Sequence, residues 1–188
     1  VFGDWSSDVC SSDLPGFPMC YGNGRFVGVT SLGWIVTSAN GADWQTARAP
    51  RAQQKVLRGV AEKGGVFVAV GDGGTILRST NGTTWRQGEV PVVEDLFSVD
   101  AGQHWFMAVG RDEAVLISTD GATWLPLEVA SQSVSTVNYT AVGFGGGAFL
   151  IATSDGHSLL SGAEPLPVGV AVSPPGAGVA LGPNKGVL

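Results

Sequence analysis

The sequence lacks the features that would mark a membrane protein, a disulfide-bonded domain or a nucleic-acid-binding protein. No apolar run approaches the roughly 18 residues that a membrane-spanning helix needs, and the only cysteines are Cys10 and Cys20. The ten basic residues form no cluster and are outnumbered by 16 acidic ones, for a net charge of −6. We therefore expect no membrane span, no disulfide framework and no nucleic-acid partner.

Glycine is the residue in excess, at 29 of 188 positions, which is about twice its usual share of roughly 7%. Apolar residues make up an ordinary 44% of the chain. This balance excludes a collagen-like chain and a disordered one, and it favours a folded domain with many turns.

Residues 4–14, DWSSDVCSSDL, differ from the rest of the chain because they show neither strand nor helix periodicity. The string resembles one reading frame of a short-read sequencing adapter, so we interpret residues 1–14 as non-native. On this interpretation the net charge becomes −3, and the native protein, with any export signal, begins upstream of Pro15. Cys20 is then the lone cysteine, and we expect it to be a small buried residue.

One seven-residue phrase occurs three times, as SANGADW at 38–44, STNGTTW at 79–85 and STDGATW at 118–124. We call each copy a box. The segments that precede the boxes also align, because phenylalanines recur at 26, 67, 106 and 149. Residues 139–161 follow the same pattern but lose the final tryptophan. The chain is therefore predicted to be a tandem repeat of about 40 residues.

Each repeat is predicted to form four short strands. In the second copy, apolar runs at 57–61 and 67–71 are separated by Gly64 and Gly65, and 75–79 follows a second glycine turn. The box then makes the last turn into a fourth strand. Such a sheet cannot bury both faces alone, so neighbouring copies must stack. The predicted fold is all-β: an open arc of about four four-stranded β-propeller blades.

The predicted domain boundaries follow from this repeat. Residues 163–188 are either a Pro/Gly-rich linker or the start of a degenerate fifth blade, since VALGPNKGVL at 179–188 overlays VAVGDGGTIL at 68–77. The four blades within 15–162 span approximately 15–45, 57–86, 96–125 and 139–162.

The phrase resembles the Asp-box, or BNR, repeat of sialidases, sortilin-type receptors and photosystem II assembly propellers. The usual Asp-box is Ser-x-Asp-x-Gly-x-Thr-Trp, whereas these copies are one residue shorter and two of them have asparagine. The fuller pattern is most similar to tandem repeats of exported bacterial proteins. The resemblance implies a propeller fold and a periplasmic, cell-surface or extracellular location, and it does not carry a function.

The box residues are expected to be structural, because a turn-forming Asp or Asn side chain bonds its own backbone. No D-x-D-x-D-G run is present, so we expect no calcium or other metal site and no cofactor. The residues assigned to structural turns are Asn40, Gly41, Trp44, Asn81, Gly82, Trp85, Asp120, Gly121 and Trp124.

In propellers of this kind the second-to-third turns and the connections between blades share one face, opposite the boxes. This face carries the variable segments 45–56, 86–95 and 125–138 and the turns 30–33, 71–74, 110–113 and 153–156. Binding sites usually lie on such loops. The charged binding candidates are Arg48, Arg51, Asp72, Arg111, Asp112, Glu113 and Asp155.

No convergent catalytic set is evident. A sialidase-like mechanism needs several arginines, a tyrosine nucleophile and an acid, yet Tyr21 and Tyr139 occupy or adjoin strand positions. His104 and His157 stand singly in turns, which disfavours a metal pair or a Ser-His-Asp set. We therefore expect a non-enzymatic scaffold that binds a protein or glycan.

Two alternatives stay open at this stage. The chain is part of a glycoside hydrolase or lyase whose catalytic residues lie in other blades, or it is an assembly factor or a spacer in a surface protein. In each case an open arc leaves unpaired strand edges and apolar blade faces exposed, which predicts self-association.

Overall fold

The computed structural model describes residues 17–47, 55–89, 91–127, 129–130, 137–161, 170–171 and 180–181. The segment 1–14, interpreted above as non-native, and the binding candidates Arg48 and Arg51 lie outside these residues.

The first three sheets each contain four antiparallel strands in chain order, as the repeat predicts. The first sheet contains β1 (Met19–Gly22), β2 (Arg25–Val29), β3 (Ile35–Ser38) and β4 (Gln45–Thr46). The second contains β5 (Leu57–Lys63), β6 (Val66–Gly71), β7 (Thr75–Ser79) and β8 (Arg86–Gln87). The third contains β9 (Leu96–Ala101), β10 (Phe106–Gly110), β11 (Val115–Ser118) and β12 (Leu125–Pro126).

The fourth sheet begins in the same way and then differs. Its antiparallel part is β14 (Tyr139–Gly145), β15 (Ala148–Thr153) and β16 (Ser158–Ser161). The outer neighbour of β16 is the parallel strand β18 (Ala180–Leu181), and β17 (Val170–Ala171) and β13 (Val129–Ala130) extend the sheet further. No box follows Ser161 in the sequence, so the turn that produces an antiparallel fourth strand in the other repeats is missing here.

The described part of the chain contains no α-helix, and its one helical element is the short 3₁₀ turn η2 (Arg111–Glu113). Nothing helical in that part is therefore long and apolar enough to cross a bilayer. The predicted all-β fold class is confirmed.

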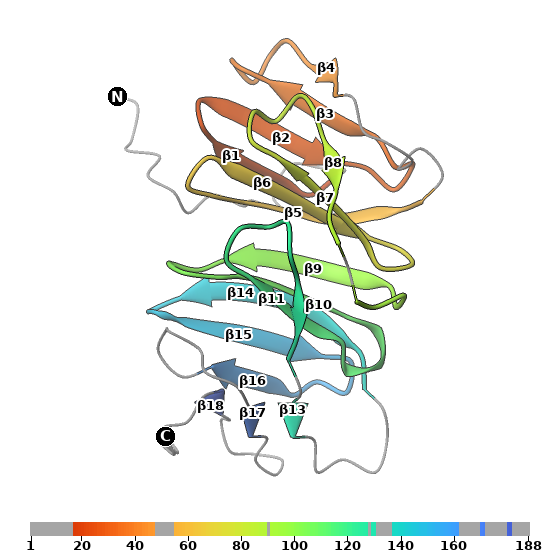
Figure 1. The fold of residues 1–188 in the computed structure, drawn as a ribbon, viewed down its shortest axis with the longest axis vertical. Coiled ribbons are helices and arrows are strands. Elements are labelled where there is room, and N and C mark those ends of the chain that lie inside the picture. The colour runs from red at the N-terminus through yellow and green to blue at the C-terminus, as the bar shows by residue number, and fades with distance from the viewer. Residues whose placement is uncertain are drawn as a thin grey trace.

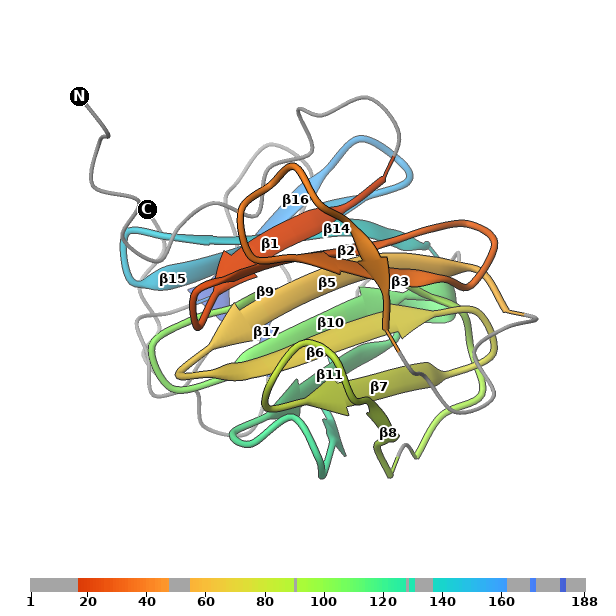
Figure 2. The same ribbon diagram turned by 90° about the horizontal axis from the view of Figure 1, so that it is seen from above.

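The four sheets stack face to face in chain order, with the first and fourth at opposite ends of the stack (Figure 1). Figure 2 shows the same stack from above, with strands of successive sheets overlying one another. The first strands of the sheets are neighbours, since β5 packs against both β1 and β9, and β9 packs against β14. The arc is open, and β1, β5, β9 and β14 line its inner side.

Alternation of side chains gives each inner sheet two buried faces. In β6, Phe67 and Ala69 pack toward the first sheet, whereas Val68 and Val70 pack toward the third. Every residue of β10 is buried for the same reason. These strands therefore read as continuous apolar runs, and the core consists of three clusters between successive sheets.

Candidate functional site

The turns gather at two opposite ends of the strands. At one end, Lys63 Nζ donates hydrogen bonds to the backbone oxygens of His104 (2.6 Å) and Thr119 (3.2 Å). Lys63 and His104 lie at first-to-second turns and Thr119 lies in the third box, so these turns and the box are at the same end. At the other end, the second-to-third turns meet the connections between sheets, as where Arg111 donates to Asp95 at 2.8 Å. We call these ends the box face and the loop face.

Each box closes on itself through one set of hydrogen bonds. In the third box, Ser118 Oγ accepts from the Gly121 N–H at 2.8 Å. Asp120 Oδ1 accepts from the next two backbone N–H groups at 2.8 and 3.0 Å. The Trp124 Nε1–H donates to the Gly121 carbonyl oxygen at 3.2 Å. The other two boxes, which have asparagine in place of aspartate, repeat these bonds.

The box oxygens are thus occupied by the turn itself, which leaves them poorly placed to bind a ligand. Within the described ranges, no group of three His, Cys, Asp or Glu side chains is placed to hold a metal ion. We infer that the boxes are structural, because each one holds its own tryptophan through a hydrogen bond, and the tryptophans of the second and third boxes pack against the preceding sheet.

Asp120→Ala is expected to lower the free energy of unfolding by about 1 kcal/mol, because losing a side-chain cap costs about 0.5–2 kcal/mol. Asp120→Asn keeps the acceptor oxygen and should be nearly neutral at pH 7. The Thr123 and Ala122 N–H groups hold the pKa of Asp120 below its usual value. The charged form therefore stabilises the fold above about pH 4, and this contribution is lost as the pH falls through the lowered pKa.

Urea unfolding of wild type and Asp120→Asn at about pH 7 and about pH 2.5 checks this sign. The wild type should lose stability relative to Asp120→Asn on acidification. Parallel losses in the two proteins would show that the Asp120 carboxylate does not contribute in the folded state.

A line of alternating charges crosses the loop face between the second and third sheets. Arg58 Nε donates to Asp72 Oδ1 at 2.5 Å. Asp95 accepts from the Gly73 N–H and from Arg111 Nη2, both at 2.8 Å. The Gly73 N–H, with a further contribution from the Arg111 guanidinium, holds the pKa of Asp95 below its usual range. Each of the two carboxylates therefore lies within hydrogen-bond distance of an arginine side chain.

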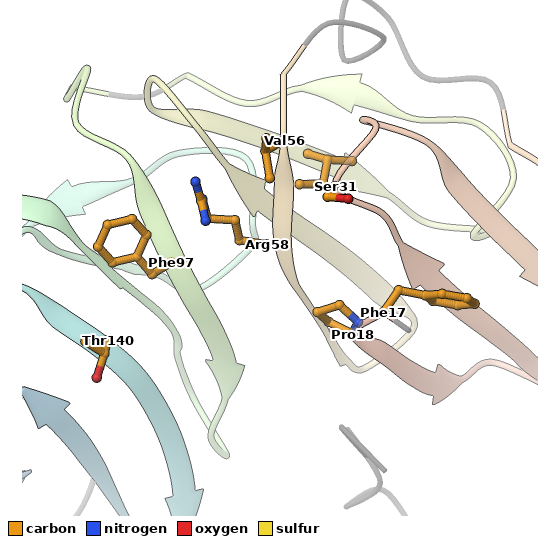
Figure 3. Close-up of a pocket in the computed structure, with 8 residues that line it drawn as sticks. Phe17, Pro18, Ser31, Val56, Arg58, Phe97 and Thr140 are labelled. Carbon is orange, nitrogen blue, oxygen red and sulfur yellow. The ribbon is translucent and has the colours of Figure 1, made fainter. Parts of the chain in front are cut away.

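An open pocket of about 430 Å³ lies beside this line, on the inner side of the arc (Figure 3). Arg58 lies between β5 and β9, with its guanidinium 5.3 Å from the centre of the Phe97 ring. Phe17 and Pro18 line the side near β1, and Thr140 lines the side near β14 (Figure 3). The pocket therefore draws on the first strands of all four sheets and the residues just before them.

One repeat position supplies a pocket residue from every sheet. Phe17, Arg58, Phe97 and Thr140 are spaced by 41, 39 and 43 residues, the same spacings as the phenylalanines that set the repeat register. The residue just before this position is buried in the last three sheets. The stacking of sheets therefore brings one variable position of each repeat to a single pocket.

The chemistry of this pocket is set by Arg58. Its Nε is bonded to Asp72, whereas its two terminal nitrogens have no hydrogen-bond partner among the described residues. The side chain is 37% exposed, and the Phe97 ring beside it limits its movement. A planar guanidinium presented in this way matches a carboxylate, which it can bind through two parallel hydrogen bonds.

The remaining sequence-based candidates do not line this pocket. Asp112 is exposed in the η2 turn, and Glu113 Oε1 accepts from the Val137 N–H at 3.4 Å. Asp155 lies in the β15–β16 turn, where hydrogen bonds from the Thr153 hydroxyl and His157 lower its pKa to about 2. Of the seven charged candidates, Asp72 is bonded to Arg58 and Arg111 extends the same line of charges.

Arg58 and Phe97 are absent from the sequence-based candidates, because those are confined to turns and connections. A signal for them exists in the sequence. When the repeats are aligned on the phenylalanines, one position holds a different type of residue from repeat to repeat: Phe17, Arg58, Phe97 and Thr140. In a repeat protein, such an exchange next to a position that is Leu or Tyr in the last three repeats indicates a residue that is free of the core.

Comparison with solved structures supports the fold. The chain aligns with the computationally designed Ika4 protein (TM-score 0.57, 16% identity, 78% of this chain and 89% of that chain). It aligns with YCF48 from Cyanidioschyzon merolae (TM-score 0.57, 14% identity, 81% and 58%), and with YCF48 bound to D1 peptide (TM-score 0.54, 19% identity, 84% and 54%). These proteins are propellers, and the chain spans little more than half the length of YCF48.

Neither a family model nor a curated protein matches this sequence. At identities below 20% the structural likeness shows the fold alone.

Proposed function

We propose that this chain is a non-enzymatic repeat scaffold that binds a protein partner through its loop face, with Arg58 receiving a carboxylate of the partner. The observation that carries this proposal is the convergence of one repeat position from four sheets on an open pocket. Arg58 is the charged member of that set, and its terminal nitrogens make no hydrogen bond to a described residue. A rigid scaffold that presents variable residues at one place is the usual arrangement of a binding protein.

The ligand class is supported by the chemistry of the pocket. The Phe97 ring supplies apolar area beside the guanidinium, which suits a carboxylate on a peptide that also buries apolar side chains. YCF48, which has the same fold, has been solved with D1 peptide bound, and this supports a peptide as the ligand type. An assembly-factor role is consistent with such binding.

The described carboxylates near the pocket argue against acid–base chemistry there. Asp72 is held by Arg58, and Asp95 is held by Gly73 and Arg111. A general acid needs a pKa raised toward neutrality, whereas the pKa of Asp95 is lowered. A glycoside hydrolase that includes this chain would therefore need its acid from another part of the protein.

The test is an NMR titration of the ¹⁵N-labelled protein with two peptides that differ only by glutamate or glutamine at their centre. The glutamate peptide should shift the amide signals of Arg58 and Phe97, and the Arg58 Nε–H signal, more than the glutamine peptide does. Arg58→Ala should weaken the glutamate-dependent binding by about tenfold or more, since a charge-assisted hydrogen bond contributes about 1.5–3 kcal/mol. Arg58→Lys should restore only part of it.

Arg86→Ala is the matched control, because Arg86 is an exposed arginine on the outer strand β8. It should leave the titration unchanged. Equal shifts from both peptides, or full binding by Arg58→Ala, would overturn the proposal. Binding of 3′-sialyllactose with release of free sialic acid would replace it with the glycoside hydrolase alternative.

A further inference from the structure

The two ends of the stack expose faces of different character. In the inner interfaces, a Phe–Trp pair of one sheet packs against the preceding sheet. Phe67 with Trp85, and Phe106 with Trp124, are both at most 3% exposed. The first sheet carries the same pair, with ring centres 6.4 Å apart as in the other two. Its Trp44 is 37% exposed, because no described sheet precedes it.

The outer side of the first sheet is rich in aromatic residues. Strand pairing places Tyr21, Phe26 and Val36 on one side. Ile35 packs toward the second sheet, so the neighbouring Trp34 turns outward, and it is 43% exposed. We define the aromatic end face as Phe17, Tyr21, Phe26, Trp34, Val36 and Trp44.

The outer side of the fourth sheet is built mainly from small residues. Phe149 and Ile151 pack toward the third sheet, so the alternate residues of β15 face away from the stack. Leu150 among them is 49% exposed. A Cβ added at Gly143 or Gly145 would meet no atom within 4 Å, so the surface above them is open. We define the small-residue end face as Ala141, Gly143, Gly145, Ala148, Leu150 and Ala152, which strand pairing places together.

We propose that two copies of this chain associate head to tail, with the aromatic end face of each copy on the small-residue end face of the other. The inner interfaces of the arc show the arrangement, since each aromatic pair there is covered by the smaller apolar side chains of the preceding sheet. The open Gly/Ala surface has room for the bulky rings, and both faces lose exposed apolar area on contact.

This association closes the arc. With four described sheets from each copy, the ring has eight sheets, which is within the usual range of about 4–8 blades. The two copies are then related by a twofold axis through the centre of the ring. The inner strands of both copies line that centre, so each pocket at Arg58 faces the same channel as its counterpart.

The experiment is sedimentation velocity of the 188-residue chain over a range of concentrations. The wild type should form a discrete species of twice the 19.2 kDa chain mass. Leu150→Arg and Trp34→Glu each place a charge on one end face and should weaken association by about thirtyfold or more, as expected for the loss of an interface hot spot. Leu125→Arg is the control, because Leu125 is 57% exposed on an inner sheet.

Mixing the two variants distinguishes this geometry from others. Leu150→Arg keeps its aromatic end face and Trp34→Glu keeps its small-residue end face, so an equimolar mixture should recover a one-to-one dimer. A head-to-head dimer would be insensitive to Leu150→Arg, and a tail-to-tail dimer would be insensitive to Trp34→Glu. Either result, or a monomeric wild type, would overturn the proposal. Far-ultraviolet circular dichroism and thermal melts confirm that each variant is folded.

Discussion

Trp124→Ala is expected to lower the free energy of unfolding by about 3–5 kcal/mol, the usual cost of removing a fully buried large aromatic side chain. Trp124 is 3% exposed and packs with Phe106 between the second and third sheets. Its Nε1–H also satisfies the Gly121 carbonyl oxygen within the box. Its removal therefore opens a cavity between two sheets. It also removes a hydrogen bond from the turn that positions the outer strand.

Trp44→Ala is the matched control, because it removes the same residue from the same place in the repeat. Trp44 is 37% exposed and makes the equivalent hydrogen bond to Gly41, so its loss should cost only about 1 kcal/mol. Both variants are compared by urea unfolding in the Leu150→Arg background, which removes any contribution from association. If the two substitutions lowered the free energy of unfolding equally, packing against a preceding sheet would contribute nothing to the stabilisation by Trp124.

Gly74→Ala is expected to destabilise the protein by about 3 kcal/mol or more. Gly74 has a φ of +64°, and an added Cβ would lie 2.2 Å from the Val92 carbonyl oxygen. The left-handed conformation costs a side-chain-bearing residue about 1–2 kcal/mol. The clash adds to this, because it is with the backbone of the connection between the second and third sheets, where Gly74 also donates to the Glu94 oxygen at 2.7 Å.

Gly64→Ala separates these two contributions. Gly64 has a similar φ of +57°, but no atom lies within 4 Å of its added Cβ. It should therefore cost only about 1–2 kcal/mol, the strain of the left-handed backbone. Thermal and urea unfolding of both variants give the comparison. If Gly74→Ala cost no more than Gly64→Ala, the connection would not lie as close to the turn as the structure places it.

The fold could be predicted from the sequence because two independent patterns agree. Short apolar runs between glycine turns indicate strands, and the repeated box fixes where each set of four begins. Continuous apolar strands such as β6 carry a further signal, since both of their faces must be covered. The all-β stack of four sheets is confirmed on these grounds. In the last repeat the box is missing after Ser161, and there the sheet continues with the parallel strand β18 instead of an antiparallel fourth strand.

The candidate site was harder to predict because it depends on how the sheets stack. Within a single repeat, nothing in the sequence distinguishes Arg58 from the other arginines. Its contact with Phe97 exists only because β5 lies beside β9 in the folded chain. Asp72 lies in a turn that sequence reasoning can find, yet its bond to Arg58 joins a turn to a strand. Contacts between repeats depend on the rotation and spacing of one sheet relative to the next. This geometry cannot be predicted from the sequence of a single repeat.

The central claim is that the second and third sheets each bury their box tryptophan against the sheet before them, and ¹⁹F NMR of the 5-fluorotryptophan-labelled protein tests it most directly. Signals are assigned by single Trp→Phe substitutions in the Leu150→Arg background, and the chemical shift of each is compared in H₂O and D₂O. We predict that Trp85 and Trp124 show almost no solvent isotope shift, whereas Trp34 and Trp44 show a clear one. Shifts of Trp85 and Trp124 as large as that of Trp34 would contradict the stacked arrangement.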